Sequence, residues 1–164
     1  MSIASNVAHV ALVGIGATLV LDAWLLALQR LGVPTSNFAL VGRWVAGMPR
    51  GRFTHAAISK AQPERFELGI GWLTHYAVGI VFAAVFVALN GAGWLAQPTW
   101  WPALAFGIAT VVVPLFVMQP AMGHGFAAAR TPSPLRTCLR SLANHAAFGT
   151  GLYVAAALLA VVMR

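Results

Sequence analysis

The chain from Leu68 to Asn90 reads LGIGWLTHYAVGIVFAAVFVALN and contains no Asp, Glu, Lys or Arg. In an α-helix, about 20 apolar residues at about 1.5 Å each cover the roughly 30 Å hydrocarbon core of a bilayer. This stretch therefore predicts a membrane-spanning helix. Three further stretches are similarly apolar, and the four predicted spans are residues 7–29, 68–90, 101–118 and 139–163.

Composition supports the same class of protein for all 164 residues. The chain is 60% hydrophobic and only 8% charged, whereas soluble domains carry roughly 25% charged residues. We therefore predict an all-α fold in which residues 1–164 form a single transmembrane domain. The four spans are predicted to form a four-helix bundle. One alternative for this bundle is a pair of repeated helical hairpins. The single cysteine, Cys138, excludes an intrachain disulfide and a two-cysteine redox motif.

The basic residues predict how the chain crosses the membrane. They gather in two of the three connections between spans, whereas residues 91–100 contain none. Because basic loops favour the cytoplasmic side, we expect both termini outside in a multi-pass protein of the bacterial inner membrane. The chain has a net charge of +7, and its basic residues lie beside the apolar spans. The expected partners are therefore the lipid bilayer and its anionic headgroups, and nucleic acid is not expected.

Two histidines stand in similar apolar settings. His75 and His145 each begin a His-x-Ala-x-Gly or His-Ala-Ala-x-Gly sequence, and each follows a proline, Pro63 or Pro134, at a distance of twelve or eleven residues. Ionisable residues inside a span are costly and mark candidate functional sites. If the two hairpins are repeats, a pseudo-twofold axis places both histidines at one depth.

Other polar residues are predicted near that depth. Asp22 lies about two turns inside the first span, and Gln119 and Asn144 lie at a similar level or just below it. The predicted polar cluster near the cytoplasmic side therefore consists of Asp22, His75, His145, Gln119 and Asn144.

Small residues recur beside these polar groups at helical spacing. Gly14, Thr18 and Asp22 follow one another at intervals of four, and Gly residues lie four positions from both His75 and His145. Small residues let membrane helices approach closely, so these faces are predicted to pack inward. Hydrogen bonding across a tight bundle explains the same pattern, which makes a purely structural or accessory role one alternative.

Two functional hypotheses use the cluster. The first is proton-linked transport of a small molecule or ion, or a channel, because histidine and an intramembrane Asp can carry protons and Pro114 permits bending of the third span. Four spans are few for a transporter, so a homodimer is expected. An enzymatic role is not expected, because no catalytic motif is recognisable.

The second hypothesis is a haem- or metal-binding membrane protein. The ligands would be His75 and His145, joined by Asp22 or Met118, because imidazole, carboxylate and thioether groups bind iron, zinc or copper. No local sequence motif marks such a site. Because the motif is lacking, we expect that no cofactor is bound.

The first basic connection contains a predicted interfacial helix. Residues 37–48 place apolar side chains on one side, and the following turn, residues 48–55, is basic. We expect Arg43, Arg50 and Arg52 to contact lipid headgroups or an anionic ligand, while a simple positive-inside anchor explains the same residues. The Gly-rich stretch at residues 118–125 does not match a P-loop.

These loops also carry a family resemblance. The segments are Phe38-Ala39-Leu40-Val41-Gly42-Arg43-Trp44, Met48-Pro49-Arg50-Gly51, His75-Tyr76-Ala77-Val78-Gly79-Ile80, Met118-Gln119-Pro120-Ala121-Met122-Gly123 and Arg130-Thr131-Pro132. Over nearly its whole length the chain resembles the bacterial family known as domain of unknown function 2938. The resemblance implies a small multi-span membrane protein and supplies no activity or catalytic residue.

Overall fold

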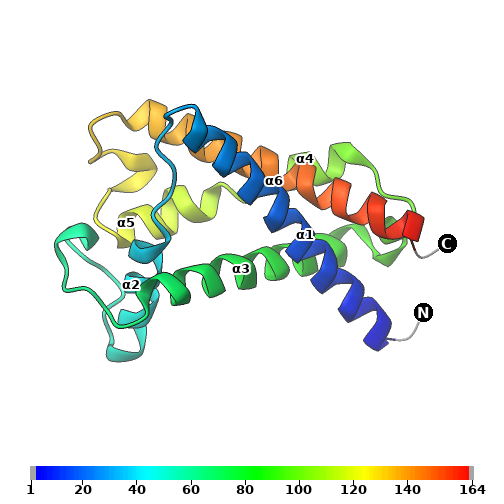
Figure 1. Ribbon diagram of the computed structural model, residues 1–164, viewed down its shortest axis with the longest axis horizontal. Coiled ribbons are helices and arrows are strands. Elements are labelled where there is room, and N and C mark those ends of the chain that lie inside the picture. Colours follow the sequence, from blue (N-terminus) through cyan, green and yellow to red (C-terminus); the bar gives the residue numbers. More distant parts are fainter. Residues whose placement is uncertain (1–2, 163–164) are drawn as a thin grey trace. The chain divides into compact units, whose positions relative to one another are not determined.

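The computed structural model describes residues 3–162, and the secondary structure of these residues is helical (Figure 1). The α-helices are α1 (Ile3–Arg30), α2 (Phe38–Gly47), α3 (Glu67–Asn90), α4 (Trp100–Ala109), α5 (Gln119–Ala121) and α6 (Pro134–Val162). The shorter elements are η1 (Met48–Arg50), η2 (Ile58–Lys60), η3 (Ala92–Leu95), η4 (Pro114–Met118) and η5 (Phe126–Ala128).

Four helical segments are long and apolar enough to cross a membrane. They are Ser5–Arg30, Glu67–Asn90, Trp100–Ala121 and Pro134–Val162. The predicted all-α fold with four spans is therefore confirmed. The helical segments begin or end up to five residues beyond the predicted spans. Met163, the predicted end of the fourth span, lies outside the described residues.

The described chain forms two compact units. Unit 1 contains the residues up to Pro34, Tyr76–Thr110 and the residues from Asn144 onward. Unit 2 contains Thr35–His75 and Val111–Ala143. Both α3 and α6 contribute residues to each unit, so we describe the units separately.

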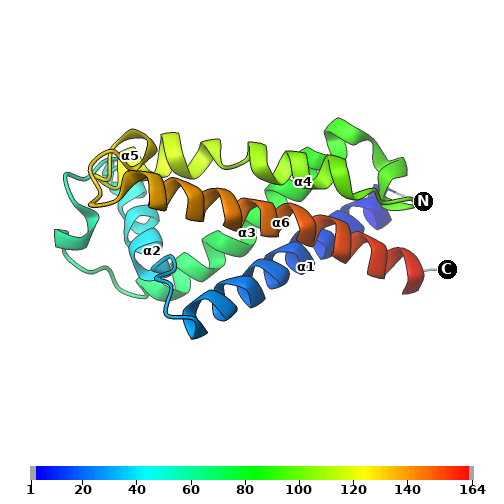
Figure 2. The same ribbon diagram turned by 90° about the horizontal axis from the view of Figure 1, so that it is seen from above.

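In unit 1, the helices meet where glycines allow their backbones to approach. In Figure 1, α1 crosses α3, and a Cβ atom added at Gly14 would lie 2.6 Å from the Cα of Ile80. Figure 2 shows α6 between α1 and α4. On its two sides, Gly151 packs against Ala17 and Gly149 packs against α4. The small-residue spacing thus correctly predicted helix contacts, because no larger side chain fits between these backbones.

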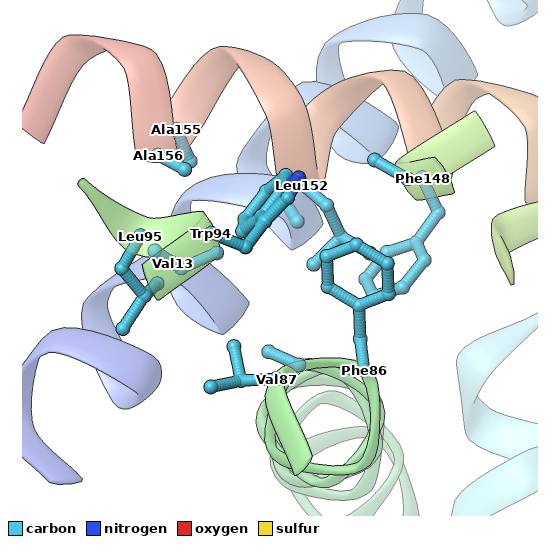
Figure 3. Close-up of a cluster of buried hydrophobic side chains, with 12 residues drawn as sticks. Val13, Phe86, Val87, Trp94, Leu95, Phe148, Leu152, Ala155 and Ala156 are labelled. Carbon is cyan, nitrogen blue, oxygen red and sulfur yellow. The ribbon is translucent and has the colours of Figure 1, made fainter. Parts of the chain in front are cut away.

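Aromatic side chains fill the rest of unit 1. Phe86 is fully buried, and its ring lies edge-on to Trp94, with ring centroids 4.6 Å apart (Figure 3). Phe148 and Leu152 of α6 complete the cluster beside Val13 of α1. The loop helix η3 supplies Trp94, so the connection after α3 folds back into the core.

In unit 2, α2 lies against the beginning of α3. Asn37 caps α2 by accepting a hydrogen bond from the backbone N–H of Ala39, which confirms that this loop contains a helix. A Cβ atom at Gly42 would overlap the carbonyl oxygen of Glu67. Backbone hydrogen bonds also join the two loops of unit 2, from His55 to Ala121 and from Ile58 to Met122.

The third span changes its helical pattern part-way along. α4 ends at Ala109, and the chain continues through a π-helical segment that begins at Pro114. Proline has no N–H to donate to the carbonyl of Thr110, so the α-helical hydrogen bonding is interrupted there. The predicted effect of Pro114 on this span is therefore confirmed as an interruption of the helix.

Candidate functional site

Asp22 forms a hydrogen bond with a tyrosine of a different span. The hydroxyl of Tyr76 donates to Oδ2 of Asp22 at 2.7 Å. The close approach of α1 to α3 at Gly14 and Gly79 brings the two side chains together. Asp22 lies eight residues before the end of α1 at Arg30, which is about 12 Å inside the span. Tyr76 lies nine residues after Glu67, about 14 Å inside α3.

Sequence reasoning selected His75 and missed its neighbour Tyr76. The missed signal was chemical, because a tyrosine hydroxyl inside a span requires a hydrogen-bond partner just as a carboxylate does. The chain has only 2 tyrosines, and an Asp lies at a similar depth in the preceding span. Considering those two residues together would have suggested the pair.

His145 is held by a hydroxyl of the interrupted third span. Nδ1 of His145 lies 2.8 Å from Oγ1 of Thr110, and this hydroxyl also lies 2.6 Å from the carbonyl oxygen of Gly107. The Thr110 hydroxyl has one proton, and the Gly107 carbonyl can only accept it. The His145 ring must therefore donate Nδ1–H to Thr110. In the neutral ring, Nε2 then carries a lone pair and no proton.

Asn144 has its own partner from the first span. Nε1–H of Trp24 donates to Oδ1 of Asn144 at 3.0 Å. Within unit 1, the described hydrogen bonds therefore connect three polar residues of the predicted cluster to three different partners. Asp22 contacts Tyr76, Asn144 contacts Trp24, and His145 contacts Thr110.

The two other members of the predicted cluster belong to unit 2. The ring of His75 lies beside those of Phe38 and Trp72, at centroid distances of 4.5 and 5.7 Å. Gln119 is buried, and its Oε1 has no hydrogen-bond partner among the described residues. Because these residues and the other three belong to different units, their meeting in one layer stays a prediction.

A further buried histidine lies near the beginning of the first span. His9 is 6% exposed, and neither of its ring nitrogens has a hydrogen-bond partner among the described residues. A neutral imidazole always carries one N–H, so this position holds an unsatisfied buried donor. Sequence reasoning did not select His9, which lies at the start of the first predicted span, far along the helix from Asp22.

The structure gives the basic residues of the first connection different roles. Arg43 forms a forked ion pair with Glu67, with Nε–Oε2 at 2.8 Å and Nη2–Oε1 at 2.9 Å. Its remaining nitrogen donates to the carbonyls of Ile58 and Ala61. The hydrogen bond with Glu67 raises the pKa of Arg43, which stays charged. Arg43 thus joins α2, the loop and α3.

Arg50 also has a protein partner. Its Nη2 lies 2.6 Å from Oε1 of Glu64, and this hydrogen bond lowers the pKa of the Glu64 carboxyl. Arg52 is exposed. Of the three arginines predicted to contact lipid or an anion, two therefore stabilise the loop itself. The lipid or anion contact of all three stays a prediction.

The described residues do not form a three-ligand metal site. Among residues 3–162, no group of three His, Cys, Asp or Glu side chains lies close enough together to hold a metal ion. His75 belongs to unit 2, whereas Asp22 and His145 belong to unit 1, so the proposed iron or zinc site of these three residues stays a prediction. Within unit 1, the Asp22 carboxylate accepts a hydrogen bond from Tyr76.

Comparison with known proteins identifies the family. A family described as protein of unknown function (DUF2938) matches residues 11–159. The chain belongs to this family. No curated protein and no solved structure matches the chain. The DUF2938 assignment includes most of all four spans, both loops of unit 2 and every residue of the predicted polar cluster, and it supplies no activity.

Proposed function

We propose that this multi-pass membrane protein has a proton-linked transport or channel function. The observation that carries the proposal is the hydrogen bond between Tyr76 and Asp22, about 12 Å inside the first span. A carboxyl group at that depth is costly, and such residues commonly belong to ion pathways or proton relays. A phenol that donates to it can hold the carboxylate in place and pass a proton to it.

The histidine of the fourth span supports the same function. Thr110 orients the His145 ring so that a proton-accepting Nε2 is available in its neutral form. The interruption near Pro114 lies directly after Thr110 and frees a backbone carbonyl in the third span. Carboxylate, phenol, hydroxyl and imidazole groups are the chemistry from which proton relays are built.

For orientation, we propose that unit 2 contains the cytoplasmic loops of a bacterial inner-membrane protein and that both termini lie outside. The support is the concentration of basic residues in the two connections of unit 2. Fusion of alkaline phosphatase after Arg164 gives activity in this orientation, and fusion within residues 51–57 does not.

The function is tested with purified protein in liposomes that contain a pH-sensitive dye. With a potassium diffusion potential imposed, wild-type protein is expected to accelerate acidification relative to protein-free liposomes. Asp22→Asn removes the proton-binding carboxylate with little change in shape and is expected to abolish the acceleration. Tyr76→Phe is expected to reduce it by about a hundredfold, at the lower end of the range for a lost proton-transfer group.

The control is Thr74→Val, because the Thr74 hydroxyl bonds only to the backbone of its own helix, at Ile70, in the described contacts. This variant is expected to keep the wild-type rate. If folded Asp22→Asn acidifies liposomes as fast as the wild type, or if the wild type equals protein-free liposomes, the proposal is wrong.

A second candidate is haem binding. The observation that favours it is the 2.8 Å contact between Nδ1 of His145 and Oγ1 of Thr110, because haem-ligating histidines commonly donate Nδ1–H to an oxygen that fixes the ring. An absorption spectrum of protein purified from haem-supplemented cells tests this candidate. A Soret band that disappears in His145→Ala supports it, and a wild-type spectrum without the band contradicts it.

A further inference from the structure

The residue before the second span has an unusual combination of conformation and exposure. Phe66 has φ +59°, in the left-handed region that glycine prefers, and its side chain is 70% exposed. The left-handed conformation costs free energy for a residue with a Cβ atom. An exposed aromatic ring in water adds no stability, whereas the interfacial region of a bilayer favours such a ring.

The turn around Phe66 is fixed by its neighbours. The Glu67 carboxylate accepts a hydrogen bond from the backbone N–H of Glu64 and also binds Arg43. The carbonyl of Phe66 accepts the N–H of Ile70 at the start of α3. These contacts fix the backbone on both sides of Phe66 and hold its ring outward.

Arg65 accompanies the exposed ring. Its guanidinium carbon lies 4.7 Å from the centre of the Phe66 ring, a cation–π contact. The chain has only 3 acidic side chains, and the described contacts join Glu64 to Arg50, Glu67 to Arg43 and Asp22 to Tyr76. Among the described contacts, exposed Arg65 therefore has no acidic partner within the chain, and its guanidinium group can bind an anion from outside it.

The position of this pair identifies that anion. Phe66 directly precedes the span Glu67–Asn90, and the exposed apolar residues Leu68 and Leu73 follow it in the span. A residue at the end of a span lies at the level of the lipid headgroups, where aromatic rings and arginines are favoured. Anionic lipids place phosphate groups at the same level.

We propose that Arg65 and Phe66 form an anionic-lipid anchor. The Arg65 guanidinium binds the phosphate of an anionic phospholipid, and the Phe66 ring packs beneath the headgroup against the acyl chains. The anchor fixes the start of α3 and, through Glu67, the loop held by Arg43. This site differs from the predicted contacts of Arg43 and Arg50, whose guanidinium groups bind protein carboxylates.

The test measures the thermal midpoint of full-length protein in a non-ionic detergent. Phosphatidylglycerol or phosphatidylcholine is added at equal concentration, and the lipid effect is the difference between the two midpoints. Wild-type protein is expected to have the higher midpoint with phosphatidylglycerol. Arg65→Gln and Phe66→Ala are each expected to lose at least half of that difference.

Lys60→Gln and Phe53→Ala are the controls, because Lys60 is an exposed basic residue that lies outside the spans. Phe53 is 59% exposed and also follows an arginine, but it precedes no span and is not among the residues with positive φ. Both control variants are expected to keep the full lipid effect. The proposal is overturned if the control variants lose the lipid effect while Arg65→Gln and Phe66→Ala keep it.

Phe66→Gly separates binding from folding. Glycine adopts the left-handed conformation without strain, so this variant is expected to fold with an unchanged or higher midpoint in phosphatidylcholine and to lose the phosphatidylglycerol effect. If Phe66→Gly and Arg65→Gln both keep the effect, the proposal is wrong. It is also wrong if inorganic phosphate or polyglutamate raises the wild-type midpoint as much as phosphatidylglycerol, because the partner would then be a soluble anion or an acidic protein.

Discussion

Helices of both units meet at glycines, but the polar interactions between the helices differ. In unit 1, the described side-chain hydrogen bonds between helices use neutral donors, such as the Tyr76 hydroxyl and the Trp24 indole N–H. In unit 2, forked and single ion pairs join α2, the loops and the beginning of α3. The difference follows from the surroundings, because charges are costly in hydrocarbon but are tolerated near water. Unit 1 has few polar side chains, and each one therefore marks a helix contact or a candidate functional group.

Alanine at the closest helix contacts is expected to have the largest effect. In Gly107→Ala, the new Cβ atom would lie 2.5 Å from the Cα of Gly149, and in Gly42→Ala it would overlap the Glu67 carbonyl. Backbone atoms cannot move aside as a side chain can, so each variant is expected to lose about 3 kcal/mol or more of stability. Denaturant titration of purified protein measures the loss.

Gly69→Ala is the control for this prediction, because a Cβ atom there meets nothing within 4 Å. It is expected to change stability by less than about 1 kcal/mol. If Gly107→Ala is as stable as Gly69→Ala, close backbone contact does not hold unit 1 together.

Removing the charge of Glu67 is expected to have the next largest effect. Glu67→Gln leaves the mostly buried Arg43 without its counterion, and we expect a loss of about 3 kcal/mol, as for other buried ion pairs. Arg43→Lys keeps the charge but loses the fork, so its loss is expected to be smaller. Equal stability of Glu67→Gln and wild type in the same titration would mean that the ion pair does not stabilise unit 2.

Replacing the hydroxyl that orients His145 tests the corresponding bond in unit 1. Thr110→Val leaves Nδ1–H without an acceptor and is expected to lose about 1–2 kcal/mol. The ring is then expected to move its proton to Nε2. Nitrogen-15 NMR of histidine-labelled protein distinguishes the two tautomers, with His145 assigned from the spectrum of His145→Gln.

Thr110→Ser keeps the hydroxyl and is expected to keep the Nδ1–H tautomer. Observation of the Nε2–H tautomer in wild-type protein would show that Thr110 donates its proton to His145, opposite to the direction inferred from Gly107.

The smallest effect is expected from the exposed ion pair of unit 2. Because Arg50 lowers the pKa of Glu64, the pair contributes its full stability above the ordinary carboxyl pKa and loses it as the pH falls through the lowered value. Wild-type protein is therefore expected to lose more stability than Glu64→Gln between neutral pH and about pH 4. Parallel pH profiles of the two proteins would contradict this prediction.

The local features of the fold were predictable because they depend on neighbours in sequence. Apolar length predicted four spans, and the amphipathic pattern of residues 37–48 predicted the helix α2. Spacing of four residues placed Gly14 and Thr18 on one face, which the contacts of α1 with α3 confirm. Pro114 predicted the interruption of the third span, because the lack of an N–H is a property of the residue itself.

The partners of the polar residues were not predictable in the same way. Asp22 and Tyr76 are separated by 54 positions, and Arg43 and Glu67 by 24. The sequence around either residue does not indicate which face of the other helix is turned toward it. Arg43 was therefore predicted to contact lipid headgroups or an anion, whereas the folded chain gives it a carboxylate and two carbonyls.

The membrane class, the four spans and the concentration of charge in two loops follow from the amino-acid sequence alone, because burial of apolar surface and helical hydrogen bonding act over one continuous segment. Which donor each buried acceptor meets depends on tertiary packing. That choice depends on how closely two helices approach, and the approach is set by glycines and side chains far apart in the chain. The pairs Asp22–Tyr76 and Thr110–His145 are therefore products of packing.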